Sequence, residues 1–122
     1  MKETMHHFDM NELLRKIREF RSARDWDQYH SPKNLAMALL VEAAELAEHF
    51  QWLTQKESFE VAKRKRDAIR DEIADVLIYL VNLADKCGID PLKAAHDKIE
   101  KNRMKYPTEK VKGRHTKYNE SV

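Results

Sequence analysis

Two pairs of carboxylates interrupt apolar runs of this sequence. Glu42 and Glu45 form the first pair, and Glu72 and Asp75 form the second. Because residues three positions apart lie on one face of a helix, both acids of a pair point the same way as neighbouring apolar side chains, toward the core. Their repulsion grows once water is removed, so two such pairs that face each other favour a bound divalent cation. Ligands that are all oxygen indicate Mg²⁺ or Mn²⁺ rather than zinc.

Acidic pairs on a helix also have simpler explanations. A single Glu-x-x-Glu at the flank of a helix normally pairs with lysines and arginines, which are numerous in this sequence. Two pairs on separate helices, each inside an apolar stripe, favour the metal site instead. A calcium-binding EF-hand would need its acids in one glycine-containing loop, and the sequence has no such loop.

Length and composition restrict the class of protein. The 122 residues suffice for one domain with a single core, and 36% charged residues with only two glycines predict a mostly helical chain. No apolar run reaches the roughly 20 residues that span a bilayer, and the polar N-terminus does not resemble a signal peptide. The single Cys87 excludes an internal disulfide, so we expect a cytoplasmic protein. A net charge of +2 is too small to indicate nucleic acid, and we expect neither a nucleic-acid nor a membrane partner.

Four helices are expected, over residues 10–24, 33–53, 55–84 and 91–104, and no strand pattern is found. The starts are marked by the capping residues Asp9, Ser31, Thr54 and Asp90. The third helix is apolar on all sides from Ile73 to Ala84, so a partner subunit is expected to cover it. We predict one all-α domain over residues 1–107, with regular structure ending at Pro107, followed by a basic, polar tail over 108–122.

Aromatic and amide side chains are expected to border the acidic pairs. Trp52 lies seven residues after Glu45 and four after Glu48, so it is expected to border the carboxylates. There it packs in a core or an interface, or stacks on a planar base. Tyr79 and Asn82 extend the second acidic stripe. A buried Asn82 needs a hydrogen-bond partner, which is either a substrate or a backbone carbonyl.

Basic and polar residues form a second group of candidates. Lys98, Asn102 and Lys105 share one face of the last helix, which is either a solvated basic face or a phosphate clamp. His30 and Asn34, at the start of the second helix, could donate hydrogen bonds to an anion there. The sequence has no glycine-rich phosphate loop and no serine or cysteine nucleophile with a convincing base, which favours metal-assisted attack by water.

These residues together resemble the MazG-like, all-α nucleoside triphosphate pyrophosphohydrolases. Glu42-x-x-Glu45, followed after 26 intervening residues by Glu72-x-x-Asp75, is similar to the family signature. Further segments, at residues 24–35, 49–52, 75–80 and 98–107, resemble the dCTP pyrophosphatase branch. The resemblance covers about residues 10–107. It implies a four-helix core assembled as a dimer or tetramer, with sites built across subunits.

The resemblance also implies an activity and a set of site residues. The activity is Mg²⁺-dependent hydrolysis of a nucleoside triphosphate, dCTP or a modified dCTP, to monophosphate and pyrophosphate. The implied metal ligands are Glu42, Glu45, Glu72 and Asp75. The implied substrate-binding residues are Trp26, His30, Asn34, Trp52, Tyr79, Asn82, Lys98, Asn102 and Tyr106. The tail, with Lys117 and Tyr118, is similar to tails in this branch.

The residues themselves agree with such a reaction. A carboxylate, Glu45 or alternatively Glu48, would orient or deprotonate the attacking water, and Lys98 would stabilise the charge that develops on pyrophosphate. Three alternatives stay open: a broad pyrophosphohydrolase for non-standard nucleotides, a non-catalytic helical protein that binds metal or a partner, and a nucleic-acid-binding bundle.

Overall fold

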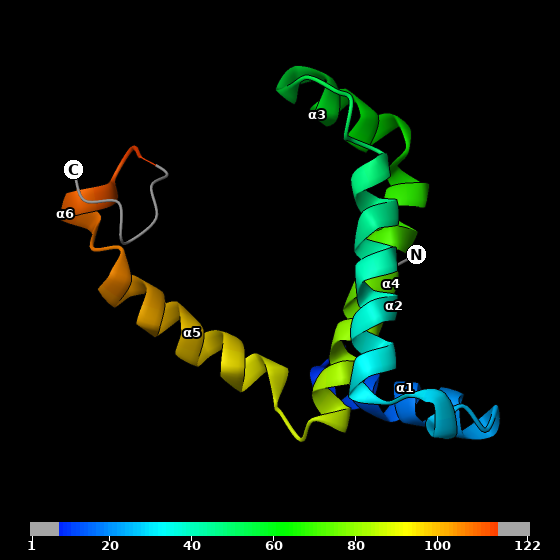
Figure 1. The fold of residues 1–122 in the computed structure, drawn as a ribbon. Helices are drawn as coiled ribbons and strands as arrows, with labels where there is room; N and C mark the ends of the chain where they lie inside the picture. The colour runs from blue at the N-terminus through cyan, green and yellow to red at the C-terminus, as the bar shows by residue number, and fades with distance from the viewer. Residues whose placement is uncertain (1–7, 115–122) are drawn as a thin grey trace, which may run out of the picture. The chain divides into compact units, whose positions relative to one another are not determined.

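The computed structural model describes residues 8–114, and every regular element within them is helical. In chain order the elements are α1 (Met10–Ala23), the 3₁₀ turn η1 (Asp27–Tyr29), α2 (Pro32–Glu48), α3 (Gln55–Arg64), α4 (Arg66–Lys86), α5 (Pro91–Lys105) and α6 (Thr108–Val111) (Figure 1). The all-α prediction is confirmed for this part of the chain. Lys117 and Tyr118 of the predicted tail lie outside the described residues.

Side-chain caps start the helices at the positions that the sequence predicts. Each cap accepts a hydrogen bond from a backbone N–H of the first turn, a group that has no partner within the helix. At Thr54 the capping box is complete, because the Glu57 carboxylate in turn accepts from the Thr54 N–H at 2.9 Å. The capping side chains belong to Asp9, Ser31, Thr54 and Asp90. These four predicted starts are therefore confirmed to within a residue.

Three predicted boundaries are wrong. α2 ends at Glu48 rather than near Leu53, because the next N–H groups bond to carbonyls three residues back and tighten the chain into turns. The predicted third helix is divided into α3 and α4 at Lys65, whose φ of −107° and ψ of 30° are not helical. The cations that precede this break interact favourably with the dipole at the end of α3. Regular structure also continues beyond Pro107, which serves as the N-cap of the short α6.

The candidate site depends on the pairing of α2 with α4. The two helices lie side by side, and α1 and α3 also contact α4 (Figure 1). Leu35 of α2 and Val81 of α4 are 1% and 2% exposed and form the centre of the core, together with Ile17 and Ile69. The chain divides into two compact units, and the boundary between them in the sequence falls between Ile89 and Asp90. Helices α1 to α4 belong to the first unit, and α5 and α6 belong to the second.

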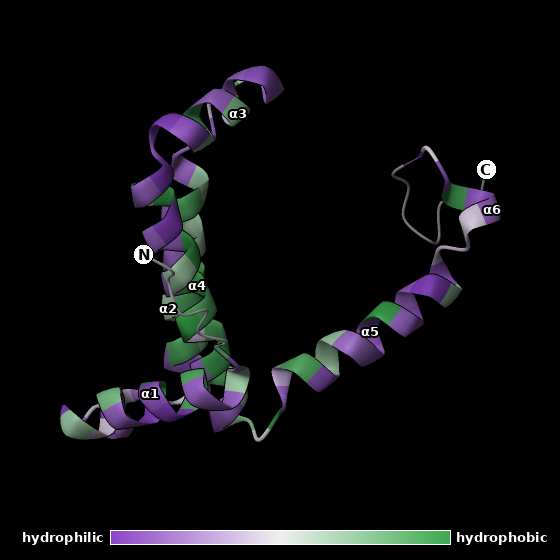
Figure 2. Ribbon diagram, turned by 180° about the vertical axis from the view of Figure 1, so that it is seen from behind, coloured by the Kyte–Doolittle hydropathy of each residue, from purple (hydrophilic) through white to green (hydrophobic). Residues whose placement is uncertain are grey.

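Large apolar side chains remain exposed on the paired helices. Figure 2 shows apolar residues along much of α2 and α4. Leu40 of α2 is 63% exposed, and Ile73 and Leu77 of α4 are 54% and 43% exposed. Helices α1 to α3, which belong to the same unit as α4, therefore do not enclose it. Among the residues that the structure describes, no helix is both long and apolar enough to cross a membrane.

Candidate active site

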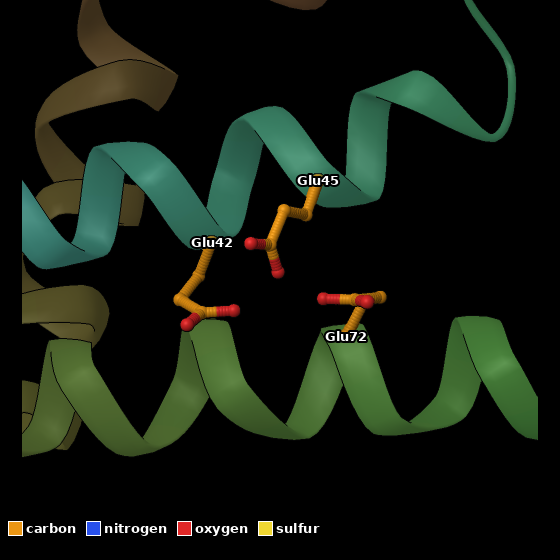
Figure 3. A group of neighbouring side chains, drawn as sticks. All are labelled: Glu42, Glu45 and Glu72. Atoms are coloured by element: carbon orange, nitrogen blue, oxygen red, sulfur yellow. The ribbon is translucent and has the colours of Figure 1, made fainter.

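Three carboxylates converge between α2 and α4. Glu42 and Glu45 extend from α2 toward α4, and Glu72 extends from α4 toward α2 (Figure 3). One oxygen atom of each carboxylate can be chosen so that all three lie within 4.8 Å of one another. Glu42 and Glu72 are half-buried, whereas Glu45 is exposed. The spacing of three residues within a helix and the side-by-side packing of two helices together produce this cluster.

The acidic cluster is electrostatically unfavourable when all three groups are ionised. Partial burial raises the pKa of Glu42, and the adjacent Glu45 carboxylate raises it further. Burial also raises the pKa of Glu72, with a further contribution from the charge of Glu45. One buried oxygen in each residue, Oε2 of Glu42 and Oε2 of Glu72, has no hydrogen-bond partner. A divalent cation would satisfy both oxygens and offset the repulsion, and a ligand set made only of carboxylate oxygen suits Mg²⁺ or Mn²⁺.

The other two predicted acidic residues have different positions. Asp75 lies one turn beyond Glu72 on α4, and its charge contributes to raising the pKa of both Glu42 and Glu72. Its carboxylate is close to the cluster electrostatically but is not among the three that approach within 4.8 Å. Glu48, the last residue of α2, is exposed and likewise lies outside that group.

A cavity of about 480 Å³ is lined in part by Asp75, whose charge acts on Glu42 and Glu72 of the acidic cluster. Its walls come from α1, from the segment around η1 and from α4, and they are mostly apolar and aromatic. Trp26 lies against the edge of Phe20, with 5.6 Å between ring centroids, and 6.1 Å from the centroid of His30. The lining residues are Leu13, Lys16, Ile17, Phe20, Arg21, Trp26, His30, Asp75, Ile78, Tyr79 and Asn82. The structure therefore gathers Trp26, His30, Tyr79 and Asn82 in one place, although they are up to 56 positions apart in the numbering of the sequence.

A buried polar network supports one wall of this cavity. Arg21 is only 8% exposed, and its Nη2 lies 2.8 Å from Oδ2 of Asp85. Its Nη1 donates to Oδ1 of Asn82 at 2.5 Å, and its Nε lies 2.7 Å from Oδ1 of Asp27. The Asn82 amide nitrogen lies 3.0 Å from Nδ1 of His30. Burial, followed by the positive charges of Arg21 and a neighbouring lysine, lowers the pKa of His30.

The sequence analysis missed Arg21 and Asp85 as members of the site. Their signal is a charged residue on an apolar stripe: Arg21 follows Ile17 by four positions, and Asp85 follows Asn82 by three. Asp85 accepts hydrogen bonds from both Arg18 and Arg21, and these bonds lower its pKa, the Arg18 bond contributing most. In the network the Asn82 amide has two side-chain partners, Arg21 and His30, which the sequence analysis did not consider.

The remaining predicted site residues lie elsewhere. Asn34 donates to the backbone carbonyl of Tyr29 at 2.9 Å and so closes the turn before α2. Trp52 lies in the turn after α2, not on the helix, and is 87% exposed. Its expected place on the helix is therefore wrong, and its place beside the carboxylates stays a prediction. Lys98, Asn102 and Tyr106 belong to α5 and its C-cap in the second unit.

The basic residues of α5 do share one face. The nearby charge of Lys105 lowers the pKa of Lys98 most strongly, and Lys101 also contributes. Mutual repulsion of this kind requires the ammonium groups to be close, as expected for residues three and seven positions apart on a helix. A concentration of positive charge on α5 would favour binding of an anion.

Fold and site together define an all-α protein with a cluster of carboxylates that could hold a cation and with an aromatic cavity lined in part by Asp75. Residues 37–120 match the MazG-like family, and the chain belongs to this family. The resemblance seen in the sequence is thereby confirmed.

Proteins of known identity extend this comparison. Human dCTP pyrophosphatase 1 (Homo sapiens) is 42% identical over 113 residues, which are 91% of this chain and 66% of the human protein. The rat protein of the same name (Rattus norvegicus) is 41% identical over 111 residues, 89% of this chain and 65% of its own length. The chain therefore matches slightly less than two thirds of each relative. A crystal structure of a pyrophosphatase from Archaeoglobus fulgidus is 50% identical, with a TM-score of 0.79, over 87% of this chain and 99% of that one.

Proposed function

We propose that this chain hydrolyses a nucleoside triphosphate between the α and β phosphates and releases a monophosphate and pyrophosphate. The observation that carries the proposal is the position of Asp75. This residue lines the aromatic cavity, and its charge acts on Glu42 and Glu72 of the acidic cluster. A base can therefore occupy the cavity while the polyphosphate extends to a cation at the carboxylates. The two relatives named dCTP pyrophosphatase 1 and the archaeal pyrophosphatase support the same reaction.

The residues that would hold the metal are Glu42, Glu45, Glu72 and Asp75. The unpartnered buried oxygens of Glu42 and Glu72 fit a hard cation, and we propose Mg²⁺, with Mn²⁺ as the alternative. When bound, such an ion neutralises charge on the triphosphate and lowers the pKa of a coordinated water.

The chain itself would supply the proton acceptor and the positioning groups. Glu45, the exposed carboxylate of the cluster, would accept a proton from the water that attacks the α phosphorus, and Glu48 is the alternative base. A bond then forms between the water oxygen and the α phosphorus. The bond from that phosphorus to the bridging oxygen breaks, and pyrophosphate leaves. Lys98 and Asn102 would stabilise the charge on the phosphates.

The proposed substrate is dCTP or a modified dCTP, and the alternative is a broader set of non-standard nucleotides. Trp26, His30 and Tyr79 line the cavity and offer aromatic faces to a base, and stacking on such faces accepts any base. Asn34, Trp52 and Tyr106 are proposed to contact the nucleotide by resemblance to the family. We propose nucleotide-pool sanitation in the cytoplasm as the role of the reaction.

We also propose that the chain functions as a homo-oligomer, a dimer or a tetramer. The exposed apolar residues of α2 and α4 support this, because they include Leu40, Val41, Ile73 and Leu77, all more than 40% exposed. Large exposed apolar side chains that gather on a pair of helices are typical of interaction sites.

A panel of canonical and modified triphosphates with Mg²⁺ tests the activity, with separate measurement of released pyrophosphate and phosphate. We expect pyrophosphate from at least one deoxycytidine triphosphate. Glu45→Gln should lower kcat by about 10²- to 10⁴-fold, the contribution of a general base. Glu60→Gln, which changes an exposed carboxylate on α3, is the matched control and should leave kcat unchanged. Near-normal turnover of Glu45→Gln with Mg²⁺ would remove Glu45 from the reaction, and a loss confined to Glu48→Gln would identify the other base.

A binding measurement separates the enzyme from a non-catalytic metal-binding protein. A non-hydrolysable triphosphate added with Mg²⁺ should raise Tm further than Mg²⁺ alone, because only a nucleotide site gains from both ligands. Equal stabilisation by Mg²⁺ with and without the analogue would favour the non-catalytic alternative.

A further inference from the structure

Asn82 connects a buried arginine with the one histidine that lines the cavity. It lies on α4, is 3% exposed, and has both ends of its amide group engaged by other side chains. Oδ1 accepts from Nη1 of Arg21 at 2.5 Å, and Nδ2 lies 3.0 Å from Nδ1 of His30. The hydrogen-bonded series therefore runs from the guanidinium of Arg21 through the amide of Asn82 to the imidazole of His30.

The hydrogen-bonding chemistry of the Arg21 guanidinium determines the orientation of the Asn82 amide and the tautomer of His30. A guanidinium only donates hydrogen bonds, so the amide oxygen of Asn82 must face Arg21 and the amide NH₂ must face His30. The NH₂ group only donates, so Nδ1 of His30 must accept. A neutral imidazole that accepts at Nδ1 has its proton on Nε2.

Arg21 cannot easily turn away from this arrangement. Nη2 of Arg21 donates to Oδ2 of Asp85 at 2.8 Å, and the side chain of Arg21 is nine-tenths buried. Nε forms an ion pair with Oδ1 of Asp27 at 2.7 Å, although the pair lacks hydrogen-bond geometry. Turning the guanidinium would leave buried charges unpaired, which costs several kcal/mol for groups of this kind. The orientation of Asn82 is consequently imposed by the fold and does not depend on a ligand.

We propose that Arg21 and Asn82 are positioning residues that hold His30 as the neutral Nε2–H tautomer, which donates a hydrogen bond to a carbonyl oxygen or ring nitrogen of the nucleobase in the cavity. This inference rests on the proposed function for the identity of the ligand. It gives Asn82 a role through His30 rather than by contact with substrate, and it adds Arg21 to the site.

Two further features agree with a neutral His30 that donates to a base. Burial and the positive charges of Arg21 and Lys86 lower the pKa of His30, whereas the charge of Asp27 opposes this effect more weakly. Trp26 lies 6.1 Å from His30 between ring centroids, so a base stacked on the indole would have its edge near the imidazole. A neutral donor suits an uncharged base, whereas an imidazolium would favour a phosphate.

Imidazole ¹⁵N spectra of the full-length, nucleotide-free protein test the tautomer directly. The sequence has six histidines, and the His30→Gln spectrum identifies the signals of His30. At pH 7 we expect an unprotonated Nδ1 and a protonated Nε2. In Asn82→Asp the group facing His30 becomes an acceptor, so the proton should be found on Nδ1. Arg18→Gln removes the ion pair between the exposed Arg18 and the largely buried Asp85, and Arg18 has no hydrogen bond to Asn82 or His30. This variant should retain the wild-type pattern.

A binding assay with a non-hydrolysable deoxycytidine triphosphate measures the consequence. Asn82→Asp should weaken binding by about tenfold, the effect of leaving one polar group unpaired in a buried site, and Arg18→Gln should not. A change that appears in KM more than in kcat would agree with a role in base binding.

The two proposals fail differently. A protonated Nδ1 in the wild-type protein, or an Asn82→Asp spectrum identical to wild type, would overturn the positioning role even if pyrophosphate release were normal. A wild-type protein that binds no triphosphate would overturn the proposed function, and with it the assignment of a nucleobase as the acceptor, whatever the tautomer of His30.

Discussion

Replacing Asp85 by asparagine tests whether the charged network around Arg21 stabilises the fold that builds the site. Asp85 and Arg21 are 11% and 10% exposed at their side chains, and their closest atoms are 2.8 Å apart. Exposed ion pairs contribute about 0 to 1 kcal/mol, whereas removing one partner of a buried pair costs about 3 to 5 kcal/mol.

The expected cost lies between these limits. Arg21 keeps Asp27 as a counter-charge, and an asparagine oxygen at position 85 can still accept one hydrogen bond. We therefore expect Asp85→Asn to lower the free energy of unfolding by about 2 to 3 kcal/mol at pH 7. For a chain of this size that corresponds to a fall in Tm of about 10 °C.

The dependence on pH has a definite sign. Arg18 and Arg21 lower the pKa of Asp85 below its ordinary value of 3.8. Beneath 3.8 the unfolded chain therefore binds more protons than the folded chain at this position, and the contribution of Asp85 to stability decreases as the pH falls through that window. Above pH 3.8 Asp85 makes its full contribution to the free energy of unfolding. The difference between wild type and Asp85→Asn should accordingly be constant at neutral pH and narrow in strong acid.

Urea unfolding followed by circular dichroism, repeated over this pH range at one protein concentration, measures the effect. Asp97→Asn is the matched control, because its ion pair with Lys93 is exposed by 60% and 74% at the two side chains and should contribute nothing measurable. Equal unfolding midpoints for wild type and Asp85→Asn at pH 7, or a difference that persists undiminished in strong acid, would refute the reasoning.

Two further predictions concern the acidic cluster and the exposed apolar face. Because burial and the adjacent carboxylates raise the pKa of Glu42, Glu42→Gln without metal should have a higher Tm than wild type at pH 8, and this difference in Tm should disappear as the pH falls toward 4.5. Adding Mg²⁺ should raise the Tm of the wild type more than the Tm of the variant. An equal response of both proteins to Mg²⁺ would exclude Glu42 as a ligand. Leu77→Asp should lower the mass measured by analytical ultracentrifugation while the helical content is retained, because Leu77 is 43% exposed on α4 of the single chain and is available to a partner subunit. A wild-type protein that is already monomeric would contradict the proposed assembly.

Local features of the sequence were sufficient for most of the secondary structure. A cap depends on a side chain and a backbone N–H only two or three residues away, so Asp9, Ser31, Thr54 and Asp90 predict where helices start. Helix ends were harder. A chain that continues α2 beyond Glu48 and a chain that turns there differ in only a few local interactions. The sequence has no glycine or proline at that point to mark the end of the helix. For the same reason Trp52 was expected on the helix, whereas it lies in the turn that follows it.

What the sequence alone determined is the chemistry available: carboxylates three residues apart, inside apolar helices, whose repulsion calls for a cation. What only the tertiary structure decided is which groups meet. Arg21, His30, Asn82 and Asp85 come from three separate segments, and their contacts exist only because α1 packs against the far end of α4. Periodicity within a helix reports the face on which a residue lies, but it contains no information about the partner that the face will meet, because that choice depends on packing between elements distant in the chain.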